Sequence, residues 1–336
     1  MSAIDELRAK DSTRVRTARP RFHPPMLATL TDDRFSDGGW LFELKLDGVR
    51  VQVIRDGDDI QLVSRNSKTL NSTYPELVDA FRRQSVDRFV VDGEVVALDE
   101  NGVPSFARLQ GRMQLTDAAA ARRSRIVITY YAFDLLHLDG YDVTSLDVSK
   151  RKLLLRRALR FRKPLQFSAH RTDGGEAFLE EACRRGFEGL IAKRAHSRYV
   201  ERRSSDWLKL KCERSQEFVI GGYTEPRGSR AGLGAILLGY YDGDDFVYAG
   251  KVGTGFDAEM LSTLARRLES LERSRSPFDR GKPTGSGVHW VRPELVCDVA
   301  FTEWTRDGSL RHPRFKGLRQ DKPARAVVRE RPRSAA

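Results

Sequence analysis

Charged side chains are set into apolar, strand-like stretches of this sequence. The segment LFELKLDGVRVQV carries Glu43, Lys45 and Asp47 at alternate positions, so an extended strand places all three on one face, opposite leucines. A lysine there can act as a nucleophile when burial and nearby cations favour the neutral amine, and Arg50 and the two carboxylates could then surround a phosphate. The alternative is a solvated sheet face that ends in a bend.

Two further segments combine carboxylates with apolar strands. FVVDGEVVALDENG carries Asp92 and Glu94 on the same side, where a buried unpaired carboxylate would be costly. The alternative is a bulge or turn with a solvated Glu94. GFEGLIAKR places Glu188 ahead of an apolar strand and Lys193 near its end, a pattern that an ordinary buried strand also explains.

Lys209 and Lys211 in WLKLKC share one face of a strand, and two aligned ammonium groups repel each other unless an anion lies between them. An edge strand protected from aggregation by its lysines is the alternative. Phe133, in YYAFDLLHLDG, could stack on a nucleotide base or belong to the core.

The elements that position these residues belong to a two-domain globular chain. It has 336 residues, 40% of them hydrophobic and 32% charged, and 59 Lys and Arg against 47 Asp and Glu give a net charge of +12. Such an excess favours a polyanionic partner. The longest apolar run, residues 126–136, is too short and too polar to span a membrane, and the N-terminus lacks a secretory signal, so we expect a cytoplasmic protein.

The sequence predicts a mixture of helices and strands. Asp-Gly or Asn-Gly pairs at 56–57, 101–102, 139–140, 242–243 and 307–308 predict hairpin turns, and hence mainly antiparallel sheets. Helical spacing predicts helices at about 75–84, 149–160 and 175–185, and one that begins at the N-cap Asp257. Beyond a polar junction near 212–216, strands near 217–223, 234–241, 246–253 and 295–304 with that one helix suit a small β-barrel of the OB type.

The three cysteines are far apart and form no CxxC motif, so they predict neither a disulfide framework nor a zinc site. We expect Cys183, Cys212 and Cys297 to be inert thiols. The six histidines show no ligand spacing and receive no catalytic role.

Taken in order, the motifs of the chain form a series that resembles the covalent nucleotidyltransferase superfamily of ATP-dependent DNA ligases. The series is K-x-D-G-x-R (45–50), S-R-N (64–66), D-G-E (92–94), A-F-D-L-L (132–136), E-G-L-I-A-K (188–193), W-L-K-L-K (207–211) and R-x-D-K (319–322). Segments such as GGYTEPRGSRAGLGAILLGYYD and AGKVGTGF are most similar to the ligase domain of the bacterial ligase D group, which acts in end joining. Ser67 stands where many relatives have glycine.

The resemblance implies an α+β fold: a nucleotidyltransferase (ATP-grasp-like) domain of antiparallel sheets with helices, followed by an OB-fold β-barrel. We expect a basic arm at 1–22, the adenylation domain at 23–213, the OB-fold at 214–330 and a tail at 331–336. The polymerase and phosphoesterase modules that accompany many such ligases are not in this sequence, so it is either a stand-alone form or an excised domain.

The resemblance also implies roles for single residues. Lys45 would attack the α-phosphorus of ATP to form a lysyl-adenylate, Glu43 would contact the adenine edge and Phe133 would stack on its face. Further ATP contacts would come from Arg50, Arg65, Lys193, Arg203, Lys209 and Lys211, and the Mg²⁺ or Mn²⁺ ligands would be Glu94 and Glu188. Arg319, Asp321 and Lys322 would reach the triphosphate only if the second domain closes over the first.

The implied substrate is nicked or broken double-stranded DNA, sealed by a monomer in the bacterial nucleoid. A Ku-type end-binding protein and an end-processing polymerase are the implied partners. Two alternatives stay open: an RNA ligase or capping guanylyltransferase with the same lysine chemistry, and a non-catalytic nucleic-acid-binding protein.

Overall fold

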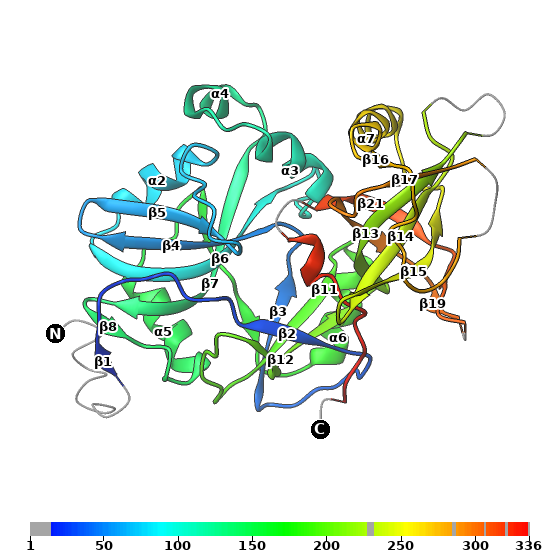
Figure 1. Ribbon diagram of the computed structural model, residues 1–336. Coiled ribbons are helices and arrows are strands. Elements are labelled where there is room, and N and C mark those ends of the chain that lie inside the picture. The colour runs from blue at the N-terminus through cyan, green and yellow to red at the C-terminus, as the bar shows by residue number, and fades with distance from the viewer. Residues whose placement is uncertain (1–14, 227–231, 284–286, 306, 320–321, 335–336) are drawn as a thin grey trace. The chain divides into compact units, whose positions relative to one another are not determined.

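The chain forms two compact units (Figure 1). In this computed structural model, the first unit holds residues 15–212 and 332–334, and the second lies within residues 213–331. The structure describes residues 15–226, 232–283, 287–305, 307–319 and 322–334. Within these residues, no helix is long and apolar enough to cross a bilayer.

Unit 1 is built from two sheets with short helices. Its strands are β1 (Arg16–Thr17), β2 (Leu27–Thr31), β3 (Trp40–Lys45), β4 (Val49–Asp56), β5 (Asp59–Ser64), β6 (Arg88–Ala97), β7 (Ile128–Leu138), β8 (Tyr141–Asp142), β9 (Leu165–Phe167), β10 (His170–Arg171), β11 (Gly189–Arg194) and β12 (Arg203–Lys211). Its helices are α2 (Pro75–Arg82), α3 (Phe106–Met113), α4 (Ala118–Arg123), α5 (Val148–Ala158) and α6 (Gly175–Arg184).

The first sheet of unit 1 has the order β1-β8-β7-β6-β4-β5, with β9 beside β7, and Figure 1 shows β5, β4, β6 and β7 side by side. The second sheet has the order β10-β3-β11-β12-β2. All pairings are antiparallel except β7 with β9 and β12 with β2, so the prediction from the Asp-Gly turns is confirmed. Valines and leucines of β4, β6 and β7 pack with α2, α3 and α5 into the largest core.

The predicted helices at 75–84, 149–160 and 175–185 are present as α2, α5 and α6. The sequence patterns missed α3 and α4, which are short but begin at good caps: Ser105 accepts from the amide of Arg108, and Asp117 from that of Ala120. Arg112 of α3 is fully buried and forms a bidentate pair with Glu76 of α2, at 2.7 and 2.8 Å. This pair fixes α3 to α2.

Unit 2 is a curled, mainly antiparallel β structure with one α-helix among its described residues. Strand β13 pairs with β14 along one edge and with β17 and β18 along the other, and β18 also pairs with β21. The elements are β13 (Ser215–Thr224), β14 (Ile236–Asp242), β15 (Asp245–Val252), α7 (Ala258–Glu269), β16 (Glu272–Arg273), β17 (Val288–Val291), β18 (Val296–Ala300), β19 (Glu303–Trp304), β20 (Leu310–Arg311), β21 (Arg314–Arg319) and the 3₁₀ turn Ala324–Ala326.

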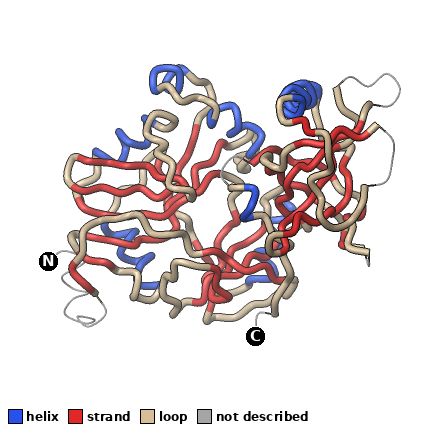
Figure 2. The backbone as a smooth tube through the Cα atoms, viewed as in Figure 1, coloured by secondary structure: helices blue, strands red, loops and turns tan. Residues whose placement is uncertain are grey.

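The predicted helix of unit 2 is confirmed as α7, whose N-cap Asp257 accepts from the amide of Met260 at 2.7 Å. Leu264 and Leu268 bury its apolar face against the strands. The sequence patterns missed β17 and β21, and Figure 2 shows how strongly strands dominate both units. The α+β class with curled sheets agrees with the prediction.

The expectation that all three cysteines are free is wrong. Cys183, at the end of α6, and Cys212, directly after β12, form a disulfide, while Cys297 is free and buried. The two paired cysteines are 29 residues apart, and they meet only because β11 brings the chain back from α6 to lie beside β12. Spacing along the sequence carries no sign of this pairing.

A candidate nucleotide site between the sheets of unit 1

The central three strands of the second sheet gather the predicted lysines. Lys45 of β3 and Lys211 of β12 lie opposite the same residue of the middle strand, Gly189. Since directly paired residues point to the same face, both ammonium groups project from one side, and between them the middle strand has no side chain. The predicted alternation is therefore confirmed for Glu43 with Lys45 and for Lys209 with Lys211, whereas β3 ends before Asp47.

The next rows of the same face carry the other predicted residues of this sheet. Ile191 lies between Glu43 and Lys209, and Lys193 pairs with Trp207. The opposite face is apolar and packs on α6 through the residues Phe42, Leu190, Ala192, Leu208, Leu210, Phe178, Leu179 and Ala182. One face thus holds the sheet in place and the other presents the charges.

Glu188 forms ion pairs with Lys45 and Lys211. Its Oε2 accepts from Lys45 Nζ at 2.5 Å, and its Oε1 lies 3.5 Å from Lys211 Nζ. The three side chains are only 10–20% exposed. The backbone holds Glu188 in place, because its carbonyl accepts from the amide of Cys212 at 3.1 Å, next to the disulfide. The pairing joins motifs that are 143 residues apart.

Glu43 lies in a buried cluster with two lysines. Its Oε1 is 2.9 Å from Lys152 Nζ and 2.8 Å from Lys193 Nζ, and its Oε2 accepts from Ser168 Oγ at 2.7 Å. Burial alone would raise the pKa of Glu43, but Lys152 and Lys193 outweigh it and lower that pKa. Burial lowers the pKa of Lys152 to about 8, against the opposing effect of Glu43.

The first sheet of unit 1 contributes Arg50 and Glu94, which lie opposite each other on β4 and β6. Arg50 is held within the protein: it donates to both oxygens of Asp92, at 3.0 and 2.7 Å, and to the carbonyl of Met26 at 2.6 Å. Asp92 also accepts from Tyr199 Oη at 2.8 Å. The Asp92–Gly93 pair is therefore no turn, and a bulge in the middle of β6 marks it instead.

Close approach explains the glycine of K-x-D-G-x-R. A Cβ atom on Gly48 would lie 2.2 Å from the carbonyl oxygen of Val95 and 3.0 Å from Cγ of Glu94. The connection from β3 to β4 thus runs directly against β6, where a side chain does not fit. This contact brings the Lys45 strand next to the Glu94 strand.

Phe133 of β7 bridges the two sheets. Its ring centre lies 4.6 Å from Lys193 Nζ and 5.3 Å from the guanidinium carbon of Arg50, and it packs edge-on to Trp207 at 6.2 Å. The ring is only partly buried, although its strand is largely apolar. This aromatic surface next to Lys193 and Glu43 has the character of a base-binding platform.

Several predicted residues lie elsewhere in the structure. Arg203 begins β12, at the opposite end from Lys211, and its exposed guanidinium donates to the carbonyl of Ala28. Arg65 lies in the turn after β5, where Ser67 adopts φ +59°, a conformation that favours glycine. A glycine would adopt this conformation without strain, in line with the glycine expected there in relatives.

The residues predicted to act from the second domain are held within unit 2. Lys322 Nζ forms an ion pair with Glu217, and Arg319 Nε lies 4.0 Å from the same carboxylate. Burial would raise the pKa of Glu217, but Lys322 and Arg319 outweigh it and lower that pKa. Asp321 lies outside the described residues.

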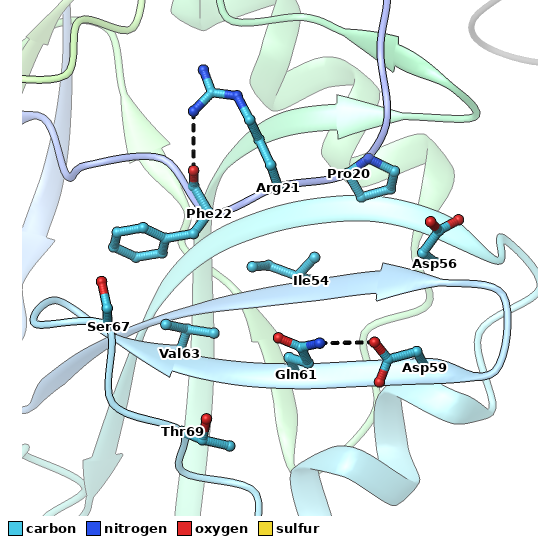
Figure 3. Close-up of a pocket in the computed structure, with 10 residues that line it drawn as sticks. All are labelled: Pro20, Arg21, Phe22, Ile54, Asp56, Asp59, Gln61, Val63, Ser67 and Thr69. Atoms are coloured by element: carbon cyan, nitrogen blue, oxygen red, sulfur yellow. Dashed lines mark hydrogen bonds between the residues drawn. The ribbon is translucent and has the colours of Figure 1, made fainter.

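A pocket of about 350 Å³ lies elsewhere in unit 1, between residues 20–22 and the β4–β5 hairpin (Figure 3). Asp56 and Asp59 line it, and two of its polar contacts are internal: Arg21 donates to the carbonyl of Phe22, and Gln61 to Asp59. Two carboxylates disfavour a triphosphate. None of the residues singled out for nucleotide binding lines this pocket. The pocket and the predicted nucleotide-binding residues therefore lie in different places, and the charged face of β3, β11 and β12 is the better candidate for the nucleotide site.

The carboxylates at the site suit a hard divalent cation. Within the described residues, no three His, Cys, Asp or Glu side chains form a metal-binding group of their own. Mg²⁺ is commonly held by one or two carboxylates together with substrate phosphates. Glu94 of β6 and Glu188, the residue before β11, are the carboxylates that would serve as such ligands. A resident, all-protein metal site is not present among these residues.

Sequence reasoning missed Lys152 and Ser168. Lys152 lies in a run of basic residues on α5, and Ser168 in the loop after β9, and neither position carries a motif. The packing of α5 against β7 brings Lys152 to Glu43, and the pairing of β9 with β7 brings Ser168 there.

Comparisons with known proteins show which family the chain resembles. The ATP dependent DNA ligase domain family matches residues 25–211, and the ATP dependent DNA ligase C terminal region matches residues 229–322. The chain is 42% identical over 325 residues to the multifunctional non-homologous end joining protein LigD of Pseudomonas aeruginosa, covering 94% of this chain and 38% of that protein. It is 38% identical over 320 residues to the protein of the same name in Mycolicibacterium smegmatis, covering 94% of this chain and 41% of that protein.

A solved structure, described as mycobacterial DNA ligase D complexed with ATP and MES, is also similar. It has a TM-score of 0.64 at 35% identity, over 92% of this chain and 98% of that chain. The chain thus spans about two-fifths of the length of the curated relatives named here, and nearly all of this solved ligase chain.

Proposed function

The chain belongs to the ATP-dependent DNA ligase family, and we propose that it seals 5′-phosphate/3′-hydroxyl breaks in double-stranded DNA through a lysyl-AMP on Lys45. The observation that carries the proposal is the row Lys45–Gly189–Lys211 with Glu188 beside it. A nucleophile, a second cation and a carboxylate share one face of a rigid sheet, and an aromatic ring lies nearby.

In the first step, the Nζ of Lys45 attacks the α-phosphorus of ATP as a free amine. A P–N bond forms, the bond to the β-phosphate oxygen breaks, and pyrophosphate leaves. Glu188 orients Nζ before ATP binds. Lys211 and Lys209 project from the same face and would stabilise the negative charge of the transition state.

In the later steps, a DNA 5′-phosphate displaces Lys45 from the AMP, and the 3′-hydroxyl then displaces AMP to seal the strand. Reprotonation of the lysine nitrogen makes it a good leaving group. Mg²⁺ or Mn²⁺ held by Glu94 and Glu188 would offset charge on the departing pyrophosphate.

The positions of several side chains support the proposed ATP contacts. Glu43 would meet the adenine edge, Phe133 would stack on its face and Lys193 lies close to both. Arg50 supports the site while it is bound to Asp92, and we keep Arg65 and Arg203 as candidates that act only if they move toward the nucleotide.

A labelling experiment tests the lysine chemistry. The protein is incubated with α-labelled ATP or GTP and a divalent ion, and the label on Lys45 is mapped by mass spectrometry. Lys45→Arg keeps a cation next to Glu188 but cannot form the adduct, so it should give no label and still seal DNA that already carries a 5′-adenylate. Label from GTP alone would indicate a capping-type enzyme, and no label in the wild type would leave only a binding protein.

We further propose that Arg319, Asp321 and Lys322 reach the triphosphate when the second unit closes over the first. Arg319→Ala should then slow self-adenylylation and spare the sealing of pre-adenylylated DNA. Equal loss of both activities would contradict closure.

The proposed setting is the repair of double-strand breaks by end joining, in the bacterial cytoplasm near the nucleoid, because relatives bear that function in their names. A Ku-type end-binding protein and an end-processing polymerase are the proposed partners. If a Ku-type protein recruits the chain, it should raise the joining of linear duplexes more than the sealing of nicks. An equal effect on both substrates would argue against recruitment.

A further inference from the structure

A fully buried lysine next to the proposed base-binding residue has no role in the chemistry described so far. Lys152 is 1% exposed and Glu43 is 2% exposed. Burying an ammonium group costs much free energy unless it is paired, and a leucine or methionine would fill the same space on α5 at no such cost. The presence of Lys152 at this point therefore calls for a reason beyond packing.

The cluster holds one carboxylate and two ammonium groups. Both lysines lie within 2.9 Å of the same oxygen, Oε1 of Glu43, while Oε2 is taken by Ser168. Oε1 is fully buried and has two cations within ion-pair distance, one more than is needed to neutralise a single carboxylate.

The two lysines are anchored differently. Lys152 Nζ donates to the carbonyl of Ser168 at 2.8 Å, in the loop that also supplies the hydroxyl to Glu43. Lys193 Nζ donates to the carbonyl of Phe133 at 3.2 Å and lies over the rings of Phe133 and Trp207, at 4.6 and 4.4 Å from their centres. Lys152 belongs to the wall of the site, and Lys193 lies on the aromatic surface where a base would stack.

We propose that Lys152 is a positioning residue that sets base specificity. Lys152 is the fixed counter-ion of Glu43, and Lys193 is the exchangeable counter-ion. When ATP binds, the 6-amino group of adenine takes the place of Lys193 at Oε1. This rests on the proposed function, since it requires ATP to bind at this face. While Lys152 stays paired with Glu43, Lys193 can leave without exposing an unneutralised buried carboxylate. A guanine would bring a carbonyl oxygen to a carboxylate that offers no proton, and would be rejected.

The test measures how strongly the enzyme recognises the 6-amino group. Rates of lysyl-AMP-type adduct formation are compared for ATP and for purine riboside triphosphate, which lacks that group. A hydrogen bond to a charged acceptor contributes about 1.5–3 kcal/mol, so the wild type should prefer ATP about 10- to 100-fold. Lys152→Met should lower this preference to near unity by slowing the reaction with ATP alone.

Two matched variants separate the roles of the cations. Lys193→Met should slow both nucleotides to a similar extent and keep the ATP preference, because Lys193 is the cation that leaves. Lys150→Met removes a charge from the same helix, two residues away, and should leave both rates unchanged. Ser168→Ala, a milder change at Oε2, should lower the preference partway, and it keeps the test valid if Lys152→Met folds poorly.

The outcomes distinguish this proposal from the proposed function. Far-UV circular dichroism and urea unfolding of each variant verify the fold independently of the nucleotide. If Lys152→Met and Ser168→Ala keep the full ATP preference while Glu43→Ala loses it, Lys152 does not position Glu43. If Glu43→Ala keeps the preference, the base contact itself is wrong, although adenylylation on Lys45 still stands. Only the absence of any adduct in the wild type removes the proposed function.

Discussion

Gly189 is the point where the geometry of the proposed site can be tested with a single methyl group. The residue pairs with Lys45 on one side and Lys211 on the other, and its φ of +143° lies in a region that favours glycine. A Cβ atom there would lie 2.0 Å from the carbonyl oxygen of Leu210 and 2.9 Å from Cα of Lys211. Both contacts are with backbone, so no side-chain rotation relieves them.

The expected cost of Gly189→Ala has two parts. Holding a non-glycine residue at this φ costs about 1–3 kcal/mol. Forcing extra volume into a packed site costs about 1–3 kcal/mol more. A domain is typically stable by about 5–15 kcal/mol, so the variant should fold but unfold at clearly lower urea concentration.

Gly186→Ala is the matched control, three residues earlier in the turn that precedes β11. Gly186 also has a positive φ, +83°, but its nearest neighbour is a single methyl group of Val103 at 4.0 Å. The free energy of unfolding of this variant should fall only by the cost of backbone strain at a positive φ, about 1–2 kcal/mol. The difference between the free energies of unfolding of the two variants gives the cost of the clash with β12.

The functional assay is the rate of lysyl-AMP formation at a temperature where both variants are folded. Relief of the clash requires β12 to move away from β11, which carries Lys211 away from Lys45. A misplacement of about 1 Å can slow a reaction about 100-fold, so we expect a loss of that order in Gly189→Ala and near wild-type rates in Gly186→Ala. If Gly189→Ala adenylylates normally and is no less stable than Gly186→Ala, the row of three residues does not position the chemistry.

Three further predictions concern stability. Ser67→Gly should stabilise the protein by about 1 kcal/mol in urea unfolding, because Ser67 has φ +59°; a loss of stability would show that the serine side chain matters more than the strain. Reduction of the Cys183–Cys212 disulfide, or its replacement by two serines, should cost about 3–4 kcal/mol for a loop closed over 29 residues, and equal urea midpoints with and without a dithiol would contradict this. Burial lowers the pKa of Lys152 from 10.5 to about 8, so between these values the unfolded chain binds a proton that the folded chain does not. The stability of the wild type relative to Lys152→Met should therefore rise from pH 8 to pH 10, and a fall over that range would refute the sign.

Local chemistry makes part of the site predictable. Alternation along a strand is enough to place Glu43 with Lys45, and Lys209 with Lys211, because the side-chain period of two depends only on the strand being extended. The Asp-Gly turns likewise indicate which strands run antiparallel, since a two-residue turn reverses the chain. The adenine and metal roles come from the resemblance and stay proposals.

The parts of the site and fold that were not predicted depend on contacts between segments far apart in the sequence. Lys152 reaches Glu43 from a helix more than a hundred residues later, and Cys183 meets Cys212 through the return of β11. The sequence around Lys152 and around Cys183 carries no motif that marks these contacts. The contacts form because α5 and α6 pack on the sheets where they do. The short helices α3 and α4 were missed for a related reason: their stability comes from caps and from the buried Arg112–Glu76 pair, and not from a long apolar stripe.

Three carboxylates of the chain each lie close to two cations. Glu43 faces Lys152 and Lys193, Glu188 faces Lys45 and Lys211, and Glu217 faces Lys322 and Arg319. Because a carboxylate left unpaired at low exposure is costly, a one-to-one pair would resist giving up its cation, whereas a two-to-one cluster can release one and stay neutralised. In the Glu43 cluster, Lys193 could therefore turn toward a nucleotide while Lys152 still neutralises Glu43, so a side chain that is paired without a ligand can take part in the proposed binding.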